Sequence, residues 1–204
     1  VAGESNSNDG DDSGNHGESD YWIVKLDSLG RIEWQKSYGG SNEDCAKSIQ
    51  KTIDGGYIIA GYSFSNDGDV SGNYGETDYW ILKIDKNGNI EWKKSYGGSK
   101  SDYANSIQQT TDGGYVIAGY TFSKDRDVSN NHGGADYWII KIDKDGNIQW
   151  QKCYGGSLKD LVTIIQKTND DGYIVAGSSY SKNGDINGHY DHLDYWIIKL
   201  DNIG

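Results

Sequence analysis

The stretch Asp78-Tyr79-Trp80-Ile81-Leu82-Lys83-Ile84-Asp85 decides the fold, because the sequence contains it four times with little change. The copies begin at Asp20, Asp78, Asp136 and Asp194. They lie 58 residues apart without insertion or deletion, and each reads D-Y-W-I-[VLI]-K-[LI]-D. Within a copy, residues alternate between two faces, which indicates a β-strand rather than a helix. A fixed period of this length predicts a repeat protein.

One complete unit runs from Asp44 to about Ser99 and predicts four short antiparallel strands. The predicted strands cover residues 46–52, 57–62, 78–85 and 89–96. Asp54-Gly55-Gly56 and Lys86-Asn87-Gly88 read as tight turns, because Gly allows positive φ. Ala60-Gly61 suits a close approach of two backbones. Four such strands describe a β-propeller blade. A β-solenoid and a β-prism are the alternatives, although a solenoid coil is usually shorter.

The whole chain, 1–204, therefore reads as one all-β array of about 3.5 repeats. Residues 1–43 form a partial blade, 44–101 and 102–159 form whole blades, and 160–204 form a second partial blade. Because a closed propeller needs at least about four blades, we expect open edges to pair with another copy or with the remainder of a longer chain. The first residue is Val1 rather than Met, so an N-terminal segment is expected to be missing. Processing, truncation and excision fit this start equally well.

Charge narrows the choice of partners. The net charge is −12 with a pI near 4.6, which argues against nucleic acid and anionic lipid as partners. Cations and neutral glycans are compatible with it. No apolar run approaches the ~20 residues of a membrane span, and no signal peptide is visible. Cys45 and Cys153 occupy different repeat positions, so neither a disulfide nor a metal site is expected from them.

Two segments carry a resemblance to known propellers. Residues 137–150, a strand with an Asp-x-x-Gly turn and a strand ending in Trp, resemble the blade motif of quinoprotein-type propellers. Gly-Gly-Tyr-[IV]-[IV]-Ala-Gly at 55–61 and 113–119 resembles Kelch-like blades. The whole chain is similar to the D-G-G-Y-I-[IV]-A-G-Y…D-Y-W-I-[VI]-K-[LI]-D repeats of large bacterial and archaeal surface proteins. That resemblance implies an architecture and a secreted or cell-surface location, and it implies no catalytic residue.

The long loop before each copy of the motif has the spacing of a calcium-binding loop. Counted from Asp67, oxygen side chains fall at positions 1, 3 and 5, Gly72 at position 6 and Asp78 at position 12. This is EF-hand spacing, in which alternate residues face one centre and Gly permits a sharp turn. However, no helices flank the loop, and position 12 is Asp instead of Glu.

The predicted calcium ligands of the four loops share these positions. They are Asp9, Asp11, Ser13 and Asp20; Asp67, Asp69, Ser71 and Asp78; Asp125, Asp127, Ser129 and Asp136; and Asn183, Asp185, Asn187 and Asp194. In the third loop Asn130 replaces the Gly, and the fourth loop has one carboxylate fewer. The alternative is a plain loop, because Asp, Asn, Gly and Ser are ordinary turn residues.

A ring-bearing residue recurs in the same loops, at His16, Tyr74, His132 and Tyr190. Beside an Asn, such a ring is a candidate to contact a sugar, and the alternative, which we favour, is a ring packed on its own loop. His189 and His192 add histidines only to the last copy, where a zinc site is not expected. The Trp residues of the third and fourth strands are predicted to pack between blades. The Lys of each third strand is predicted to pair with a carboxylate.

These patterns predict a non-enzymatic, extracellular module for adhesion, surface structure or filament assembly, stabilised by calcium and able to bind glycans. Repetition favours this class, because it multiplies weak sites. The alternative is a propeller domain of a larger secreted hydrolase or oxidoreductase. Its candidates are His189, Asp191 and His192.

Overall fold

The structure is a computed structural model that describes residues 1–187 and 193–204, and within these ranges it contains fourteen strands in four antiparallel sheets. The first sheet holds β1 (Ala2–Ser5), β2 (Asp20–Leu26) and β3 (Ile32–Tyr38). The second holds β4 (Asp44–Lys51), β5 (Tyr57–Ser63), β6 (Asp78–Ile84) and β7 (Ile90–Tyr96). The third holds β8 (Asp102–Gln109), β9 (Tyr115–Thr121), β10 (Asp136–Ile142) and β11 (Ile148–Tyr154). The fourth holds β12 (Asp160–Lys167), β13 (Tyr173–Ser179) and β14 (Asp194–Leu200).

Every sheet is a meander whose strands pair in chain order. In the second sheet, β5 pairs with β6 without interruption from Tyr57↔Ile84 to Ser63↔Asp78. A register shift between Ala46 and Ser48 marks a bulge in β4, and the same shift recurs at the corresponding place in β8 and β12. The predicted strands are therefore confirmed, with ends that differ by a residue or two, and the repeat spacing is confirmed with them.

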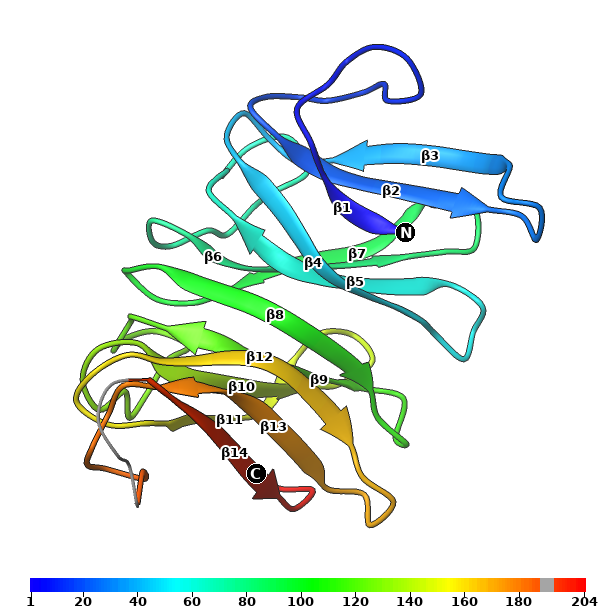
Figure 1. The fold of residues 1–204 in the computed structure, drawn as a ribbon. Helices are drawn as coiled ribbons and strands as arrows, with labels where there is room; N and C mark the ends of the chain where they lie inside the picture. The colour runs from blue at the N-terminus through cyan, green and yellow to red at the C-terminus, as the bar shows by residue number, and fades with distance from the viewer. Residues whose placement is uncertain (188–192) are drawn as a thin grey trace.

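The sheets follow one another from the N-terminal to the C-terminal end of the molecule (Figure 1). β8 of the third sheet packs against β5 and β6 of the second, and β12 of the fourth packs against β9 and β10 of the third. None of the described sheets closes on itself. The architecture is thus a row of stacked antiparallel sheets. Within the described ranges, no helix is long and apolar enough to cross a membrane.

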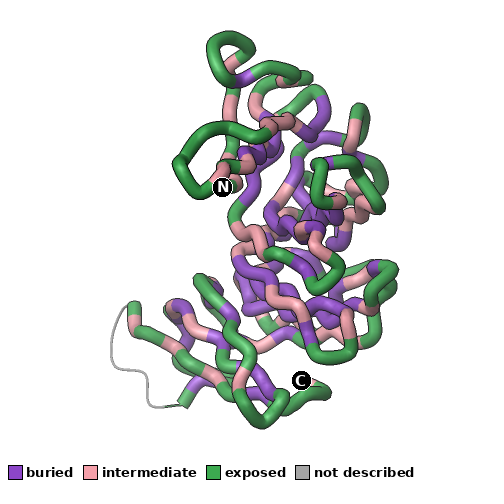
Figure 2. Tube along the Cα trace, turned by 90° about the vertical axis from the view of Figure 1, so that its right-hand side faces the viewer, coloured by how far each residue is buried: buried purple, intermediate pink, exposed green. Residues whose placement is uncertain are grey.

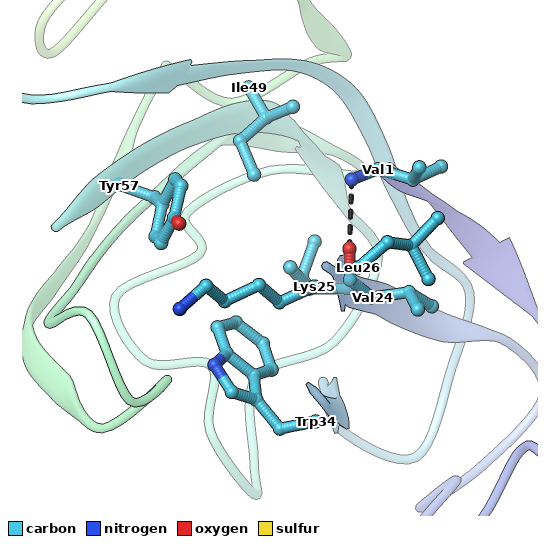
Figure 3. Close-up of a pocket in the computed structure, with 8 residues that line it drawn as sticks. Val1, Val24, Lys25, Leu26, Trp34, Ile49 and Tyr57 are labelled. Atoms are coloured by element: carbon cyan, nitrogen blue, oxygen red, sulfur yellow. Dashed lines mark hydrogen bonds between the residues drawn. The ribbon is translucent and has the colours of Figure 1, made fainter. Parts of the chain in front are cut away.

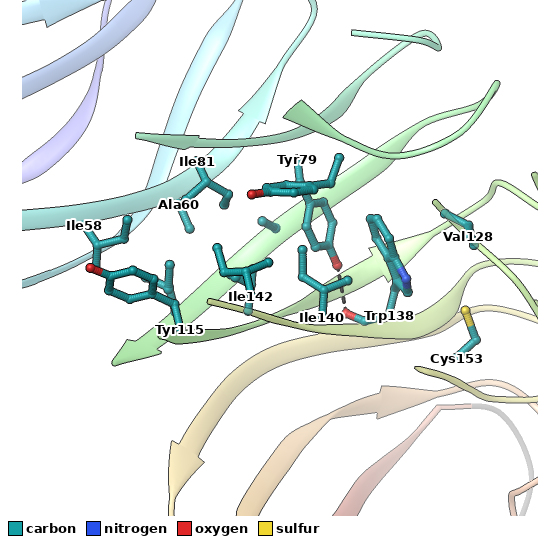
Figure 4. Packing of buried hydrophobic residues seen from close by; sticks show 14 residues of the cluster. Ile58, Ala60, Tyr79, Ile81, Tyr115, Val128, Trp138, Ile140, Ile142 and Cys153 are labelled. Atoms are coloured by element: carbon teal, nitrogen blue, oxygen red, sulfur yellow. Dashed lines mark hydrogen bonds between the residues drawn. The ribbon is translucent and has the colours of Figure 1, made fainter. Parts of the chain in front are cut away.

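The core lies between the sheets, as Figure 4 shows for the second and third. Tyr79 of β6 and Trp138 of β10 have ring centroids 4.5 Å apart, and the Tyr79 hydroxyl donates to the Trp138 carbonyl over 2.9 Å. The same pair forms between the first and second sheets and between the third and fourth. These equivalents are Tyr21–Trp80 and Tyr137–Trp196. The prediction that third-strand Trp residues pack between units is confirmed for these three.

Burial decreases towards both ends of the row (Figure 2). All seven residues of β6 and of β10 are buried, whereas the first six residues of β14 alternate between intermediate and exposed. The predicted pairing of the third-strand Lys is also confirmed. Lys83 is 3% exposed and bonds Asp54 at 2.9 Å and Glu91 at 2.6 Å. Lys25 of the first sheet is 32% exposed and bonds Glu33 at 2.7 Å.

Ala60-Gly61 serves the close backbone approach that the sequence predicts. A Cβ on Gly61 would lie 2.0 Å from the carbonyl oxygen of Cys45 on the neighbouring strand β4. The cysteines are buried and free, as expected. Burial raises the pKa of both Cys45 and Cys153, which keeps these thiols protonated.

Candidate functional site: the carboxylate junctions between sheets

Consecutive sheets are joined by a Gly-Gly connection, and acidic side chains gather around each one. The three connections are Gly39-Gly40, Gly97-Gly98 and Gly155-Gly156. Each follows the last strand of one sheet and leads into the first strand of the next. We call the surroundings of these connections the first, second and third junction.

The second junction brings together carboxylates from three places in the chain. Asp78 begins β6, Asp102 begins β8, and Asp127 lies in the loop between β9 and β10. A Cβ on Gly97 would lie 2.3 Å from Asp78 Oδ1 and 2.6 Å from Asp102 Oδ2. The Gly97 amide donates to Asp127 Oδ2 over 3.2 Å. Gly97 is therefore required here, because any side chain would collide with two carboxylates.

The first and third junctions repeat this arrangement. The third contains Asp136, Asp160 and Asp185 around Gly155, and the first contains Asp20, Asp44 and Asp69 around Gly39. Asp69 reaches Gly39 through its backbone amide, and its carboxylate lies 3.5 Å from Lys93. At Gly39 a Cβ would meet Asp20 Oδ1 at 2.4 Å and Asp44 Oδ2 at 2.6 Å. At Gly155 the Asp136 and Asp160 oxygens both lie 2.6 Å from the Cβ position. The same pair of oxygens thus recurs at every junction.

The two strand-initial carboxylates of each junction are fully buried. One oxygen of each carboxylate accepts hydrogen bonds from the protein. At the second junction, Gly98 N donates to Asp102 Oδ2 over 2.8 Å and Tyr74 N donates to Asp78 Oδ2 over 2.7 Å. The other oxygen has no hydrogen-bond partner in Asp20, Asp44, Asp78 and Asp136. A buried carboxylate oxygen without a donor is costly when charged. The junction therefore favours a proton or a cation beside these oxygens.

This burial raises the pKa values of the junction carboxylates. Loss of hydration, together with the neighbouring Asp102 and Asp127 charges, raises the pKa of Asp78 to about 7. Burial also raises the pKa of Asp44 and of Asp102 to about 6. In Asp44, hydrogen bonds to Oδ2 from the Gly40 amide and the Ser65 hydroxyl oppose the shift. The second junction therefore takes up protons near neutral pH.

The recurring ring position faces the junction carboxylate of its own loop. His16 Nδ1 lies 2.7 Å from Asp20 Oδ2, and His132 Nδ1 lies 2.7 Å from Asp136 Oδ2. Tyr74 occupies this position in the second loop, where its ring is half exposed and the Arg126 guanidinium lies 4.4 Å from its centroid. Tyr190 lies outside the described residues, as do His189, Asp191 and His192.

The positions predicted as one calcium loop divide between two junctions. Asp67, at position 1, accepts the Ser41 amide over 2.8 Å and so faces the first junction. Asp78, at position 12 of the same loop, faces the second junction beside Gly97. In the same way, Asp125 accepts the Ser99 amide and Asn183 accepts the Ser157 amide. At Gly97, Asp78 at position 12 of one loop therefore meets Asp127 at position 3 of the next loop.

The remaining predicted ligands have separate surroundings. Ser13 and Ser129, at position 5, accept from the amides of Gln35 and Gln151, and the Ser71 carbonyl accepts from Ser95. Asp9 accepts from Ser7, while Asp11 and Asn187 are exposed. Asp194 begins β14 at the end of the row. Gly72 and Asn130, both at position 6, have φ of 79° and 63°, so the third loop keeps the turn without Gly.

Sequence reasoning missed the strand-initial Asp44, Asp102 and Asp160. Their spacing of 58 residues was a signal, but nothing in a single repeat links them to an Asp of the preceding one. Among residues 1–187 and 193–204, no three His, Cys, Asp or Glu side chains are positioned to hold a metal ion. An ion at a junction would therefore require the carboxylates to close around it.

A pocket of about 240 Å³ lies between the first two sheets, beside Val1 (Figure 3). Ile23, Trp34, Ile49 and Tyr57 give it apolar walls, and Lys25 contributes its aliphatic stem. No junction carboxylate lines it. In the second sheet the corresponding Lys83 is covered and bonded by Asp54. The pocket thus reflects the smaller number of strands in the first sheet, and the acidic chemistry lies elsewhere.

Comparison with known proteins shows similarity to a curated protein and to solved structures. No protein-family profile matches the chain. The regulatory protein FlaEY of Caulobacter vibrioides is 27% identical over 161 residues, which cover 72% of this chain and 17% of FlaEY. The chain therefore spans about a sixth of the length of that relative. A crystal structure of a protein of unknown function from Bacteroides caccae matches 78% of this chain and 45% of its own, with a TM-score of 0.45 and 12% identity.

Proposed function

We propose that this chain is a non-enzymatic, extracellular repeat module that acts in adhesion, surface structure or filament assembly. The observation that carries the proposal is the repetition of the junction: three Gly-Gly connections hold the same buried carboxylate pair. An enzyme generally concentrates its chemistry at one place, whereas a binding or structural array distributes it. The candidate residues of the alternative, a hydrolase or oxidoreductase domain, are His189, Asp191 and His192, which lie outside the described residues.

The proposal includes a propeller arrangement of the sheets. Four-stranded meanders, stacked face to face with large aromatics between them, are what propeller blades require. The closing sheets would come from another copy or from the remainder of a longer chain. Electron microscopy of the purified chain tests this, because a propeller gives ring-shaped particles, whereas an open row gives curved rods.

Calcium belongs to the proposal as a ligand of the junctions. Its support is the buried, unpaired oxygen of Asp20, Asp78 and Asp136, together with an acidic residue from the next loop. Calcium takes six to eight oxygen ligands, and carboxylates supply them best. When bound, the ion would neutralise charges that otherwise remain buried close together.

Calorimetric titration with calcium at pH 7.5 tests this part. We expect binding by the wild type and a loss of one site in Asp78→Asn, which keeps the shape of the side chain but removes its charge. Asp145→Asn is the matched control, because the Asp145 side chain is exposed and its carboxylate pairs with Lys144. Equal calcium binding by wild type and Asp78→Asn would argue against a junction site.

Glycan binding is proposed at the ring positions, where His132 and Asn131 lie together in an exposed loop. A glycan array probed with wild type and with His132→Ala, in calcium and in EDTA, tests it. We expect weaker glycan-array signals from His132→Ala than from the wild type. Signals that are the same for both proteins would exclude this loop as the sugar site.

A further inference from the structure

The outer face of the fourth sheet is apolar and exposed. The strand register places Ile164, Ala176 and Ile197 side by side on this face, and Ile174 and Tyr195 lie two residues from them along β13 and β14. Tyr195 is 95% exposed, Ile197 61%, Ile164 43% and Ile174 40%. We call these four residues the C-terminal face. Monomeric proteins rarely leave a continuous apolar sheet face in water, so this face is a candidate for association.

The repeat shows what covers this face elsewhere in the chain. Tyr79, Ile81 and Ile58 are the counterparts in the second sheet, and all three are fully buried against the third sheet. Tyr137, Ile139 and Val116 are buried in the same way against the fourth. In each case the Tyr hydroxyl donates to the carbonyl of a Trp one sheet further on.

The opposite end of the row presents the other half of this contact. Trp22, Val24 and Leu26 lie on one side of β2, where Trp22 is part-buried, Val24 is buried and Leu26 is exposed, and we call them the N-terminal face. Their counterparts in β6 are Trp80, Leu82 and Ile84, all of them buried against the first sheet together with Tyr21. Leu26 is 42% exposed, whereas Ile84 is 0% exposed.

We propose that the C-terminal face binds the N-terminal face of a second copy of this chain, head to tail, with Tyr195 donating to the Trp22 carbonyl. The contact would continue an interface that the molecule already forms three times, at ring-centroid distances of 4.4 to 4.6 Å. Such a heterologous contact produces a ring if the rotation closes and a filament if it does not. The inference rests on the propeller stacking proposed above and identifies its partner.

The fourth sheet differs from the earlier sheets at one position of this face. Ile164 stands where the second and third sheets have Ser48 and Ser106. The Ser48 hydroxyl accepts the Ile107 amide of β8, the first strand of the following sheet, over 3.3 Å. Position 164 lacks such a hydroxyl, so the outer face of the fourth sheet presents an apolar side chain where the earlier sheets present an acceptor.

Complementation between two variants tests the head-to-tail contact. Tyr195→Asp destroys the C-terminal face and Leu26→Asp destroys the N-terminal face, while each leaves the other face intact. Sedimentation equilibrium at 5–200 µM should show assemblies of wild type, monomers of each variant alone, and a one-to-one heterodimer when the variants are mixed. Ile53→Asp is the matched control, because Ile53 is 84% exposed in a turn away from both faces, and it should assemble like the wild type.

Three results would overturn the proposal. They are a wild type that is monomeric throughout, a mixture of variants that does not pair, and a Leu26→Asp variant that still dimerises while Tyr195→Asp does not, since the last indicates a symmetric contact. Circular dichroism of each variant establishes that it is folded. Calcium and glycan binding are measured on the same samples. Loss of this binding would contradict the proposed function, whereas the result on assembly would be unaffected.

Discussion

β6 and β14 have nearly the same sequence but opposite surroundings. β6 reads Asp-Tyr-Trp-Ile-Leu-Lys-Ile and β14 reads Asp-Tyr-Trp-Ile-Ile-Lys-Leu. In β6 every residue is buried, whereas in β14 Tyr195 is 95% and Ile197 is 61% exposed. The strand forms in both places because its alternating pattern is the same. Burial, and with it most of the stabilisation, comes from the neighbouring sheet that packs against the strand. The same substitution should therefore have different effects at an interior position and at its counterpart near an end of the row.

The largest difference is expected at the Gly of the second strand. In Gly119→Ala the new Cβ would lie 1.9 Å from the Tyr103 carbonyl oxygen and 2.6 Å from the Tyr79 hydroxyl, so β8 and β9 would have to separate. We expect a loss of about 4 kcal/mol or more, or failure to fold. The equivalent Gly3 has no atom within 4 Å of its Cβ position, so Gly3→Ala should change stability by less than about 0.5 kcal/mol. Urea unfolding followed by Trp fluorescence measures both, and similar losses would contradict the comparison.

Removing the third-strand Tyr side chain comes next. Tyr79→Ala leaves a cavity between two sheets and removes the bond to the Trp138 carbonyl, which should cost about 3 to 5 kcal/mol. Tyr195→Ala, measured at low protein concentration where chains do not associate, should cost less than about 0.5 kcal/mol. Thermal and chemical denaturation of both variants provide the measurement. A large effect of Tyr195→Ala under these conditions would show that its exposed ring has a structural role within the chain.

The buried carboxylate predicts a pH dependence. Because the pKa of Asp78 is about 7 in the folded protein and about 3.9 in an unfolded chain, the folded state binds a proton that the unfolded state does not bind at intermediate pH. The stabilisation is complete below the unfolded value and is lost as pH rises through about 7. We expect the free energy of unfolding in EDTA to fall by about 2 kcal/mol between pH 5 and pH 8 from this group.

Asp78→Asn should flatten this pH profile, because its amide cannot titrate. Glu76→Gln is the control, since Glu76 is exposed and accepts a bond from the Ser101 hydroxyl. Its profile should follow that of the wild type. A wild-type stability that is constant or rises from pH 5 to pH 8 would contradict the assignment.

The smallest difference is expected at the third-strand Lys. Lys83→Met removes a nearly buried ammonium that bridges Asp54 and Glu91, which are both exposed enough to be rehydrated. We expect a loss of about 1 kcal/mol, reduced by added salt. Lys25→Met removes only the bond to Glu33 in a more exposed setting and should be close to neutral. Unfolding curves at 0.02 M and 0.5 M NaCl distinguish the two, and the idea fails if Lys25→Met shows the larger salt dependence.

The strands were predictable because their information is local. Alternation at Trp80, Leu82 and Ile84 and the turn at Lys86-Asn87-Gly88 lie within one repeat. The junctions were not predictable in this way, because Asp78 and Asp102 lie 24 residues apart and Asp127 belongs to the next unit. A loop spacing at positions 1, 3, 5 and 12 suggests a single centre. Once sheets are stacked, positions 1 and 12 face different neighbours, which no spacing rule within one loop anticipates.

The Tyr-to-Trp hydrogen bonds connect each sheet to the next at a constant separation of 59 residues. A chain built in this way has a mechanical consequence. If the two termini are pulled apart, the load passes from sheet to sheet, and the end units give way before the interior ones. Each 58-residue unit would release about 200 Å of extended chain. Successive extension steps of equal length, ordered from the ends inwards, are therefore the expected response of this molecule to tension.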